Sequence, residues 1–205
     1  MLAELTRNRI IPVIIIKDAQ RATGLGEALI RGGLPVAEVT FRTDAAPEAI
    51  RQMSQLDGLL VGAGTIVNAA QVDAAVAAGA QFLVSPGLSA SVVRRAQELG
   101  VPIVPGTVNP SEIMAALELG LDTLKFFPAE VFGGVAALKA LASPFSQVKF
   151  IPTGGVTPAN LADYLALPNV VAVGGSWMVS QAAIADGDFD AIATECAAAV
   201  AAAGA

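Results

Sequence analysis

The segment Thr123–Glu130, TLKFFPAE, is a short apolar run with one amine in its middle. Its β-branched and aromatic residues and the closing proline predict a buried strand of about five residues. A charged ammonium is costly to remove from water, so a buried lysine tends to lose its proton, and the neutral amine is a nucleophile toward carbonyls. The alternative is that Lys125 extends from a strand end to solvent, as lysines commonly do.

Similar apolar, β-branched runs recur on both sides of this segment. Between them lie Ala- and Leu-rich segments whose apolar residues follow helical spacing. Eight such strand–helix units, each beginning roughly 21 to 26 residues after the last, predict an α/β fold in which a parallel sheet closes into a (β/α)8 TIM barrel. The runs begin near Ile10, Val36, Leu59, Gln81, Pro102, Thr123, Val148 and Val170.

A doubly wound open sheet is the main competing fold. That fold usually carries a Gly-rich phosphate turn after its first strand, whereas the first strand here leads into Lys17–Gln20 without glycine. Helix-start signals fit the eight units, since Asn109–Glu112 has a capping asparagine, a proline and an acidic residue, and Thr157–Pro158 repeats the cap and proline. The barrel is therefore the favoured prediction.

Three helical segments carry their own expectations. Met1–Asn8 has helical spacing and predicts a short N-terminal helix before the barrel. Gly24 and Gly26 lie inside the segment Ala19–Arg31, where glycine is unfavourable, so either another backbone approaches closely there or the surface serves a purpose other than helix stability. The alanine-rich end, Glu195–Ala205, is expected to fray beyond its first turns.

Length and composition limit the class of protein. A chain of 205 residues supports one sizeable core, so we expect a single domain over residues 1–205. Although 54% of the residues are hydrophobic, no uninterrupted run of about eighteen apolar residues offers a membrane span, and nothing marks the chain for secretion. The single cysteine, Cys196, excludes an internal disulfide and fits a reducing, cytoplasmic compartment.

Charge and residue types limit the chemistry. A net charge of -6 with 12 basic residues argues against a nucleic-acid partner, although backbone amides can still bind a small anion. The chain has no histidine, which removes the commonest metal ligand and the usual base at neutral pH. We therefore expect no metal and no other cofactor, with chemistry resting on Lys, Glu, Asp, Arg and hydroxyl groups.

The second strand adds polar groups to the barrel interior. Over Val36–Arg42 the period of two places Glu38, Thr40 and Arg42 on one face and the apolar Val39 and Phe41 on the other. The apolar pair should face the helices, so the polar set should face the lumen. One interpretation is a buried ion pair without chemical consequence; the other is a base, an anion-binding group and, with Lys125, an amine.

Glycines follow several strands at the end where barrel active sites lie. Thr153-Gly154-Gly155 follows strand seven, and Gly174-Gly175-Ser176 follows strand eight. Bare backbone amides at these positions suit a phosphate group, while the alternative is that they form tight turns only. After strand three, Gly62–Thr65 offers a hydroxyl at Thr65 that can donate to a carboxylate, a weak signal by itself.

Six short motifs follow one another along the chain, namely Glu38–Thr43 (EVTFRT), Gly62–Thr65 (GAGT), Ser85–Gly87 (SPG), Lys125–Glu130 (KFFPAE), Pro152–Gly155 (PTGG) and Gly174–Trp177 (GGSW). Together they resemble the bacterial 2-keto-3-deoxy-6-phosphogluconate aldolase family, metal-free class I enzymes that also act on 4-hydroxy-2-oxoglutarate. The resemblance implies a homotrimer and a phosphorylated keto acid as substrate. It covers the chain from about Ile10 to Asp188.

The resemblance also implies a role for each candidate site residue. Lys125 would form the Schiff base and Glu38 would be the general acid and base, while Arg42 and Thr65 would bind the substrate carboxylate. The phosphate would lie at the far end of the site, formed by Thr153, Gly154, Gly155, Gly174 and Ser176.

Two alternatives belong to other classes. One is a redesigned trimeric barrel, derived from such an aldolase, that serves as a building block for a larger designed assembly. The other is a phosphate-binding barrel isomerase or decarboxylase, which is weaker because those barrels usually rely on sets of Asp, Lys or His that are not matched here.

Overall fold

The computed structural model describes residues 5–7 and 9–204 of the chain. Eight parallel strands form one sheet in the order β7-β6-β5-β4-β3-β2-β1-β8, and bridges between Phe150 and Val170 and between Thr153 and Gly174 join β7 to β8. The sheet therefore closes on itself, which confirms the predicted barrel. The strands are β1 (Ile10–Ile14), β2 (Val36–Thr40), β3 (Leu60–Gly64), β4 (Phe82–Ser85), β5 (Ile103–Thr107), β6 (Thr123–Phe126), β7 (Lys149–Pro152) and β8 (Val173–Gly175).

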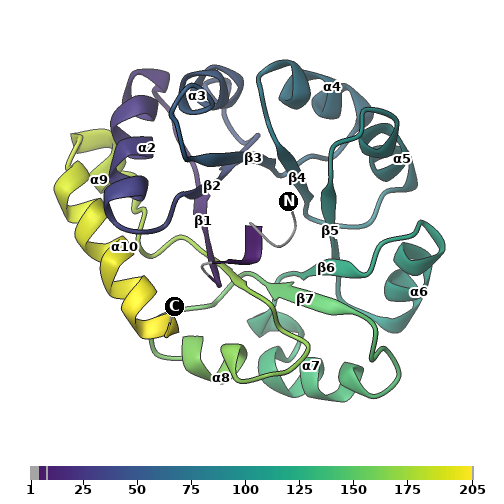
Figure 1. Cartoon of the computed structure of the whole chain (residues 1–205). Coiled ribbons are helices and arrows are strands. Elements are labelled where there is room, and N and C mark those ends of the chain that lie inside the picture. Colours follow the sequence, from purple (N-terminus) through teal and green to yellow (C-terminus); the bar gives the residue numbers. More distant parts are fainter. Residues whose placement is uncertain (1–4, 8, 205) are drawn as a thin grey trace.

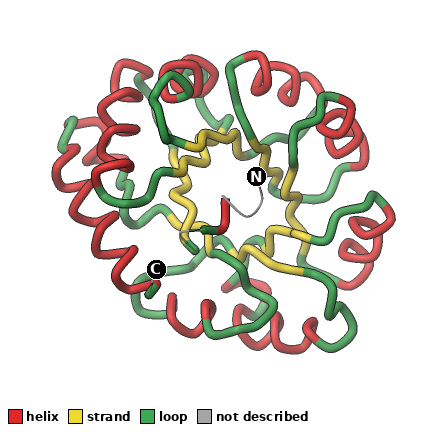
Figure 2. The backbone as a smooth tube through the Cα atoms, in the orientation of Figure 1, coloured by secondary structure: helices red, strands yellow, loops and turns green. Residues whose placement is uncertain are grey.

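Helices surround this ring of strands on the outside (Figures 1 and 2). They are η1 (Ala19–Arg21), α2 (Ala22–Arg31), α3 (Ala46–Met53), α4 (Ala69–Ala77), α5 (Ala90–Glu98), α6 (Pro110–Glu118), η2 (Glu130–Phe132), α7 (Gly134–Ala142), α8 (Leu161–Leu165), α9 (Gln181–Asp186) and α10 (Phe189–Ala203). The predicted strand starts agree with the structure to within one residue except in the last unit. There Val170 makes only a bridge, and β8 begins at Val173.

Alternation along the strands separates two apolar cores. Outward residues such as Val39 and Val61 pack against the helices in a large outer cluster. Inward residues such as Ile11, Val84 and Ile151 form a smaller cluster inside the ring. Because the outer cluster holds the helices to the sheet, part of the interior can carry polar groups without breaking the fold.

The N-terminal segment reaches the inner core. Leu5 and Thr6 are helical, and Leu5 is buried in the inner cluster. In Figure 1 these first helical residues lie across the centre of the ring. Arg7 already forms a turn, and the other residues of the predicted helix, 1–4 and 8, lie outside the described residues.

The glycines of α2 are explained by close packing. A Cβ added to Gly24 would lie 2.3 Å from the ring of Phe189, and one added to Gly26 would lie 2.4 Å from Leu56. The expected close approach is therefore real, but it comes from side chains rather than from another backbone. Backbone does approach at Gly32, at the end of α2, where an added Cβ would lie 2.7 Å from the carbonyl oxygen of Ala193 in α10.

The expectation that the C-terminal end frays is wrong. The helix α10 continues to Ala203 and runs beside α2 (Figure 1), with Cys196 buried against Gly32. The guanidinium of Arg9 donates to the carbonyls of Ala203, at 3.2 Å, and Leu165, at 2.6 Å, so one cation caps the ends of α10 and α8. Burial raises the pKa of the Cys196 thiol to about 12.

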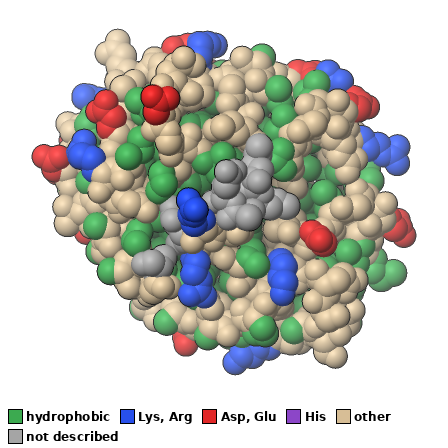
Figure 3. Space-filling model, in the orientation of Figure 1, with side chains coloured by type: hydrophobic (Ala, Val, Ile, Leu, Met, Phe, Trp, Pro, Cys, Tyr) green, Lys and Arg blue, Asp and Glu red, His purple; other side chains and the backbone are tan. Residues whose placement is uncertain are grey.

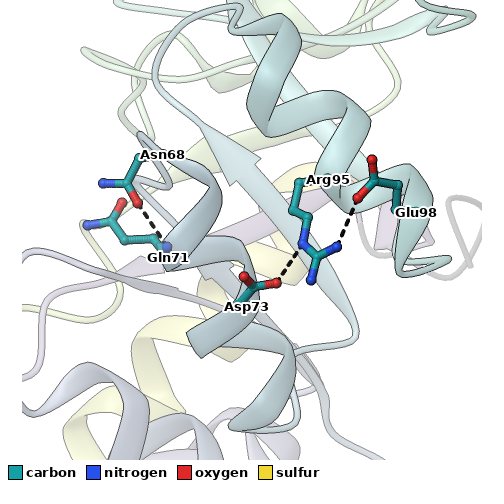
Figure 4. Close-up of polar contacts among 5 residues, drawn as sticks. All are labelled: Asn68, Gln71, Asp73, Arg95 and Glu98. Carbon is teal, nitrogen blue, oxygen red and sulfur yellow. Dashed lines mark hydrogen bonds and ion pairs between the residues drawn. The ribbon is translucent and has the colours of Figure 1, made fainter.

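Neighbouring outer helices are also joined at the surface. Asn68 caps α4 by accepting from the amide of Gln71, and Arg95 of α5 donates to Asp73 of α4 and to Glu98 (Figure 4). Exposed ion pairs of this kind contribute little to stability because water screens them.

Charged side chains of both signs are spread over the face of the barrel shown in Figure 3, with no continuous basic stripe on it. Within residues 5–7 and 9–204, no helix is both long and apolar enough to cross a membrane.

We predict that Gly32→Ala lowers the stability of the chain. The new methyl group would lie 2.5 Å from the Cβ of Cys196 and 2.7 Å from a backbone oxygen, neither of which can rotate away. Overpacking of this kind costs about 1–3 kcal/mol, which should lower the melting temperature measured by circular dichroism. Gly87→Ala is the control, because a Cβ there meets nothing within 4 Å. Equal melting temperatures for the two variants would contradict the packing described for α2 and α10.

Candidate active site

Lys125 and Glu38 meet inside the barrel. Lys125 of β6 and Glu38 of β2 are the only buried charged side chains among the residues that the structure describes, with side-chain exposures of 6% and 4%. The Lys125 Nζ lies 3.2 Å from the Glu38 Oε1. Lys125 is therefore buried as predicted, and the alternative that it extends to solvent is wrong.

The neighbouring strand β3 makes room for this pair. A Cβ added to Gly64 of β3 would lie 2.3 Å from the Glu38 Oε1, so the strand beside the carboxylate needs glycine. On the other side, Gly106 of β5 is the register partner of Lys125, but a Cβ added there would lie 2.2 Å from the Pro86 carbonyl oxygen, so this glycine leaves space for backbone and not for the lysine. The Lys125 Nζ also lies 5.1 Å from the centre of the Phe127 ring, within the range of a cation–π contact.

Arg42 and Thr65 lie beyond the carboxyl ends of β2 and β3. The predicted second strand extended to Arg42, but β2 ends at Thr40, so the turn rather than the strand period places the guanidinium. The Arg42 Nε donates to the Thr65 Oγ1 at 3.0 Å. Thr43 anchors the same turn by donating to the carbonyl of Ile16. The contact agrees with the grouping of Arg42 and Thr65 that the family resemblance implies, whereas the strand period alone did not relate these two residues.

The backbone of Thr65 is strained. Its φ is 60°, in the left-handed region that a β-branched residue rarely adopts. Strained residues of this kind cluster at functional sites, where the surrounding structure holds them in place. The strain accompanies the hydrogen bond to Arg42 at the same end of the barrel as the lysine and glutamate.

The glycine-rich turn after β7 and the glycines of β8 come together. Thr153 is the bridge partner of Gly174, and a Cβ added to Gly174 would lie 2.3 Å from the Thr153 Oγ1. Gly154 and Gly155 have φ values of 95° and 81°, so two consecutive residues need the left-handed region. The structure therefore brings four of the five residues predicted for the phosphate end into one place.

The fifth residue, Ser176, lies just beyond β8 and is exposed. It lines a pocket of about 290 Å³ together with Val13 and Ile15 of the β1 side and Trp177 of its own loop. This pocket adjoins the carboxyl ends of β1 and β8, the strand that holds Gly174.

A Glu130–Tyr164 contact was missed by the sequence analysis. The buried hydroxyl of Tyr164 donates to the Glu130 Oε1. Burial, and secondarily this hydrogen bond and the carboxylate charge, raise the pKa of Tyr164 well above its usual range. Glu130 is part of the KFFPAE motif, which gave a signal, whereas nothing in the sequence pattern marks Tyr164.

Comparison with known proteins places the chain in a family. A family described as "Aldolase: KDPG and KHG aldolase" matches residues 1–195. The chain belongs to this family. It is 47% identical to the KHG/KDPG aldolase of Escherichia coli K12 over 189 residues, which cover 92% of this chain and 89% of that protein. This result confirms the resemblance carried by the six motifs.

Solved structures agree with this assignment. The 2-keto-3-deoxy-6-phosphogluconate aldolase of Zymomonas mobilis ZM4 with 3-phosphoglycerate is 44% identical, with a TM-score of 0.89 and coverage of 96% of this chain and 95% of that one. The KDPG aldolase of Legionella pneumophila, with pyruvate captured as a covalent carbinolamine, is 43% identical, with a TM-score of 0.90 and coverage of 93% of each chain.

The alternative of a designed scaffold is not favoured. A cube-shaped cage designed by fusing symmetric oligomeric domains also matches, but at 28% identity, with a TM-score of 0.81 and coverage of 95% of this chain and 71% of that one. The natural aldolases are more similar by both measures. Family membership likewise replaces the alternative of a barrel isomerase or decarboxylase.

We predict that the single tyrosine resists ionisation as long as the chain is folded. A raised native pKa means that the folded state keeps its proton where the unfolded state loses it. The contribution of protonated Tyr164 to the stability of the folded chain is therefore complete below about pH 10, the usual pKa of tyrosine. It is lost as the pH rises above that value. Ultraviolet absorbance of phenolate, recorded beside circular dichroism during alkaline titration, should show ionisation together with unfolding. Reversible ionisation near pH 10 in a folded chain would contradict the buried Tyr164 contact.

Proposed function

We propose that the chain is a class I aldolase that cleaves 2-keto-3-deoxy-6-phosphogluconate into pyruvate and glyceraldehyde 3-phosphate, and that it also acts on 4-hydroxy-2-oxoglutarate. The observation that carries the proposal is the buried Lys125–Glu38 pair, with 3.2 Å between Nζ and Oε1. An amine and a carboxylate in hydrogen-bond contact, in a site largely closed to water, are the two groups that Schiff-base chemistry needs.

The first stage joins the substrate to Lys125. Glu38 accepts a proton from the ammonium, and the Nζ lone pair attacks the C2 ketone. Glu38 passes that proton to the ketone oxygen and takes a second proton from Nζ, which gives the neutral carbinolamine. Glu38 then returns a proton to the C2 hydroxyl, water leaves, and an iminium remains on Nζ. One carboxylate beside the nitrogen can carry each of these protons because it alternates between acid and base.

The second stage breaks the C3–C4 bond. The C4 hydroxyl loses its proton to Glu38, C4 becomes the aldehyde carbon, and the bonding electrons move through C3 and C2 onto the nitrogen to give an enamine. In this proposal the iminium nitrogen withdraws the electrons, so no metal is needed for that step. Protonation at C3 regenerates the iminium, and water attacks C2 to release pyruvate and restore Lys125.

Substrate binding involves two ends of the site. Arg42, supported by its 3.0 Å hydrogen bond to Thr65, binds the carboxylate next to the ketone. At the other end the turn Thr153–Gly155, Gly174 of β8 and Ser176 bind the phosphate. Gly154 and Gly155 are in the left-handed region, which allows backbone amides to approach an anion closely.

A cytoplasmic homotrimer completes the proposed function. Val131 and Phe132 after β6 and Met114 on α6 are large apolar side chains exposed by 79%, 49% and 57% in the single chain. Exposed apolar groups of this size suit burial between subunits.

We predict opposite kinetic effects for two site variants. Glu38→Gln should lower kcat by about 10²- to 10⁴-fold with little change in the affinity for pyruvate, because the amide keeps the shape but cannot accept a proton. Arg42→Ala should mainly raise KM, by about 10- to 100-fold, because the guanidinium binds the carboxylate in ground and transition states alike. Both constants can be measured with a coupled assay for pyruvate release.

The same two substitutions made at surface residues serve as controls. Glu98→Gln and Arg31→Ala remove a carboxylate and a guanidinium from exposed ion pairs of α5 and α2, so both should keep the parent's constants. Near-normal kcat and KM in Glu38→Gln and Arg42→Ala would show that the pair is structural and would refute the proposed mechanism.

A further inference from the structure

We propose that Glu130 and Tyr164 are positioning residues that hold the turn Thr153–Gly155 in the shape that accepts the substrate phosphate. The inference rests on the proposed function, which assigns that turn to the phosphate. Neither residue was among the predicted binding groups: Glu130 lies against the turn, and Tyr164 contacts Glu130 from α8. Three sets of contacts carry the argument.

The backbone after β6 orients the turn first. The amides of Ala129 and Glu130 donate to the carbonyls of Thr153, at 2.8 Å, and Gly154, at 3.1 Å. In a trans peptide the N–H points opposite to the carbonyl of the preceding residue. The N–H groups of Gly154 and Gly155 are therefore directed away from the backbone after β6. The N–H of Gly155 therefore faces the β8 side of the ring, where Gly174 begins the other half of the proposed phosphate site.

The Glu130 side chain, which is partly open to solvent, packs against Gly155 of the turn. A Cβ added to Gly155 would lie 2.4 Å from the Glu130 Cγ, so the side chain occupies the space that any larger residue would need. On its other side, a Cβ added to Gly134 would lie 3.0 Å from the Glu130 Oε1 and 2.9 Å from the Tyr164 hydroxyl. Gly155 therefore leaves space for the stem of the Glu130 side chain, and Gly134 leaves space for its contact with the phenol.

Tyr164 fixes where the carboxylate charge lies. Its ring is fully buried in α8, the helix that follows the turn, so its hydroxyl is a rigid donor to the Glu130 Oε1. A carboxylate near an anion site repels the anion unless it is held aside. The hydroxyl keeps the Glu130 oxygen beside α8 and Gly134, and without it the carboxylate could rotate toward the glycine amides and compete with phosphate.

Steady-state kinetics of Tyr164→Phe, Glu130→Ala and Glu130→Gln tests the proposal. For 2-keto-3-deoxy-6-phosphogluconate, Tyr164→Phe and Glu130→Ala should raise KM about tenfold with kcat within about twofold of the parent, the size expected for one lost hydrogen bond. Glu130→Gln should keep a KM within about threefold of the parent value, because its amide oxygen still accepts from Tyr164 and carries no charge.

A reaction without phosphate provides the second measurement. Exchange of the methyl protons of pyruvate with deuterium, followed by NMR, requires the Schiff base but no phosphate contact, so all three variants should retain the parent rate within about twofold. Asn169→Ala is the control for general destabilisation, since it removes a buried hydrogen bond to Leu138 near the amino end of β8. It should leave both reactions unchanged.

The outcomes separate the inference from the proposed function. An unchanged KM in Tyr164→Phe, or an equal loss of cleavage and pyruvate exchange in it, would overturn the positioning role while leaving the aldolase assignment intact. A parent enzyme that neither cleaves the sugar acid nor exchanges pyruvate protons would instead refute the proposed function. A selective rise in KM that Glu130→Gln avoids supports the inference.

Discussion

The ion pair between Lys125 and Glu38 is the interaction on which the rest of the site depends. Each charge is costly to bury alone, and each is stabilised by the other inside a barrel that excludes most water. Removing either partner would leave an uncompensated charge in the interior. Gly64 on the strand beside Glu38 is consistent with this constraint, because a side chain at Gly64 would displace the carboxylate.

The barrel can accommodate this polar interior because its stability comes from elsewhere. The outer cluster between strands and helices contains most of the buried apolar residues, while the inner cluster around Leu5, Ile11 and Phe82 fills another part of the ring. The turns that carry Arg42, Thr65 and the paired glycines lie at the carboxyl ends of the strands, as in other barrels of this class. Stability and chemistry therefore use different faces of the same strands.

Much of this arrangement could be predicted from the sequence because it follows from local periodicity. Continuous apolar runs located the strands, and a period of two placed Glu38 inside the ring and Val39 in the outer core. Arg42 was assigned to the same strand face, but the strand ends at Thr40 and the turn positions the guanidinium instead. Local alternation cannot show where a strand stops when the following residues are also compatible with a strand.

Contacts between distant segments were beyond that reasoning. Arg9 caps a helix that ends at Ala203, 194 residues later, so an alanine-rich tail that would fray alone is held in place. The Glu130–Tyr164 hydrogen bond likewise joins the segment after β6 to α8, and only the folded chain brings them together. Such contacts depend on the closed barrel and leave no periodic trace in the sequence.

The central claim is that Lys125 forms a covalent bond with the keto acid. Incubation with pyruvate and borohydride, followed by peptide mass mapping, tests it directly. Lys139, an exposed residue of α7, serves as an internal comparison. The account predicts one stable adduct on the peptide that contains Lys125, and none in a Lys125→Met variant. An adduct spread over other lysines, or no adduct at all, would contradict it.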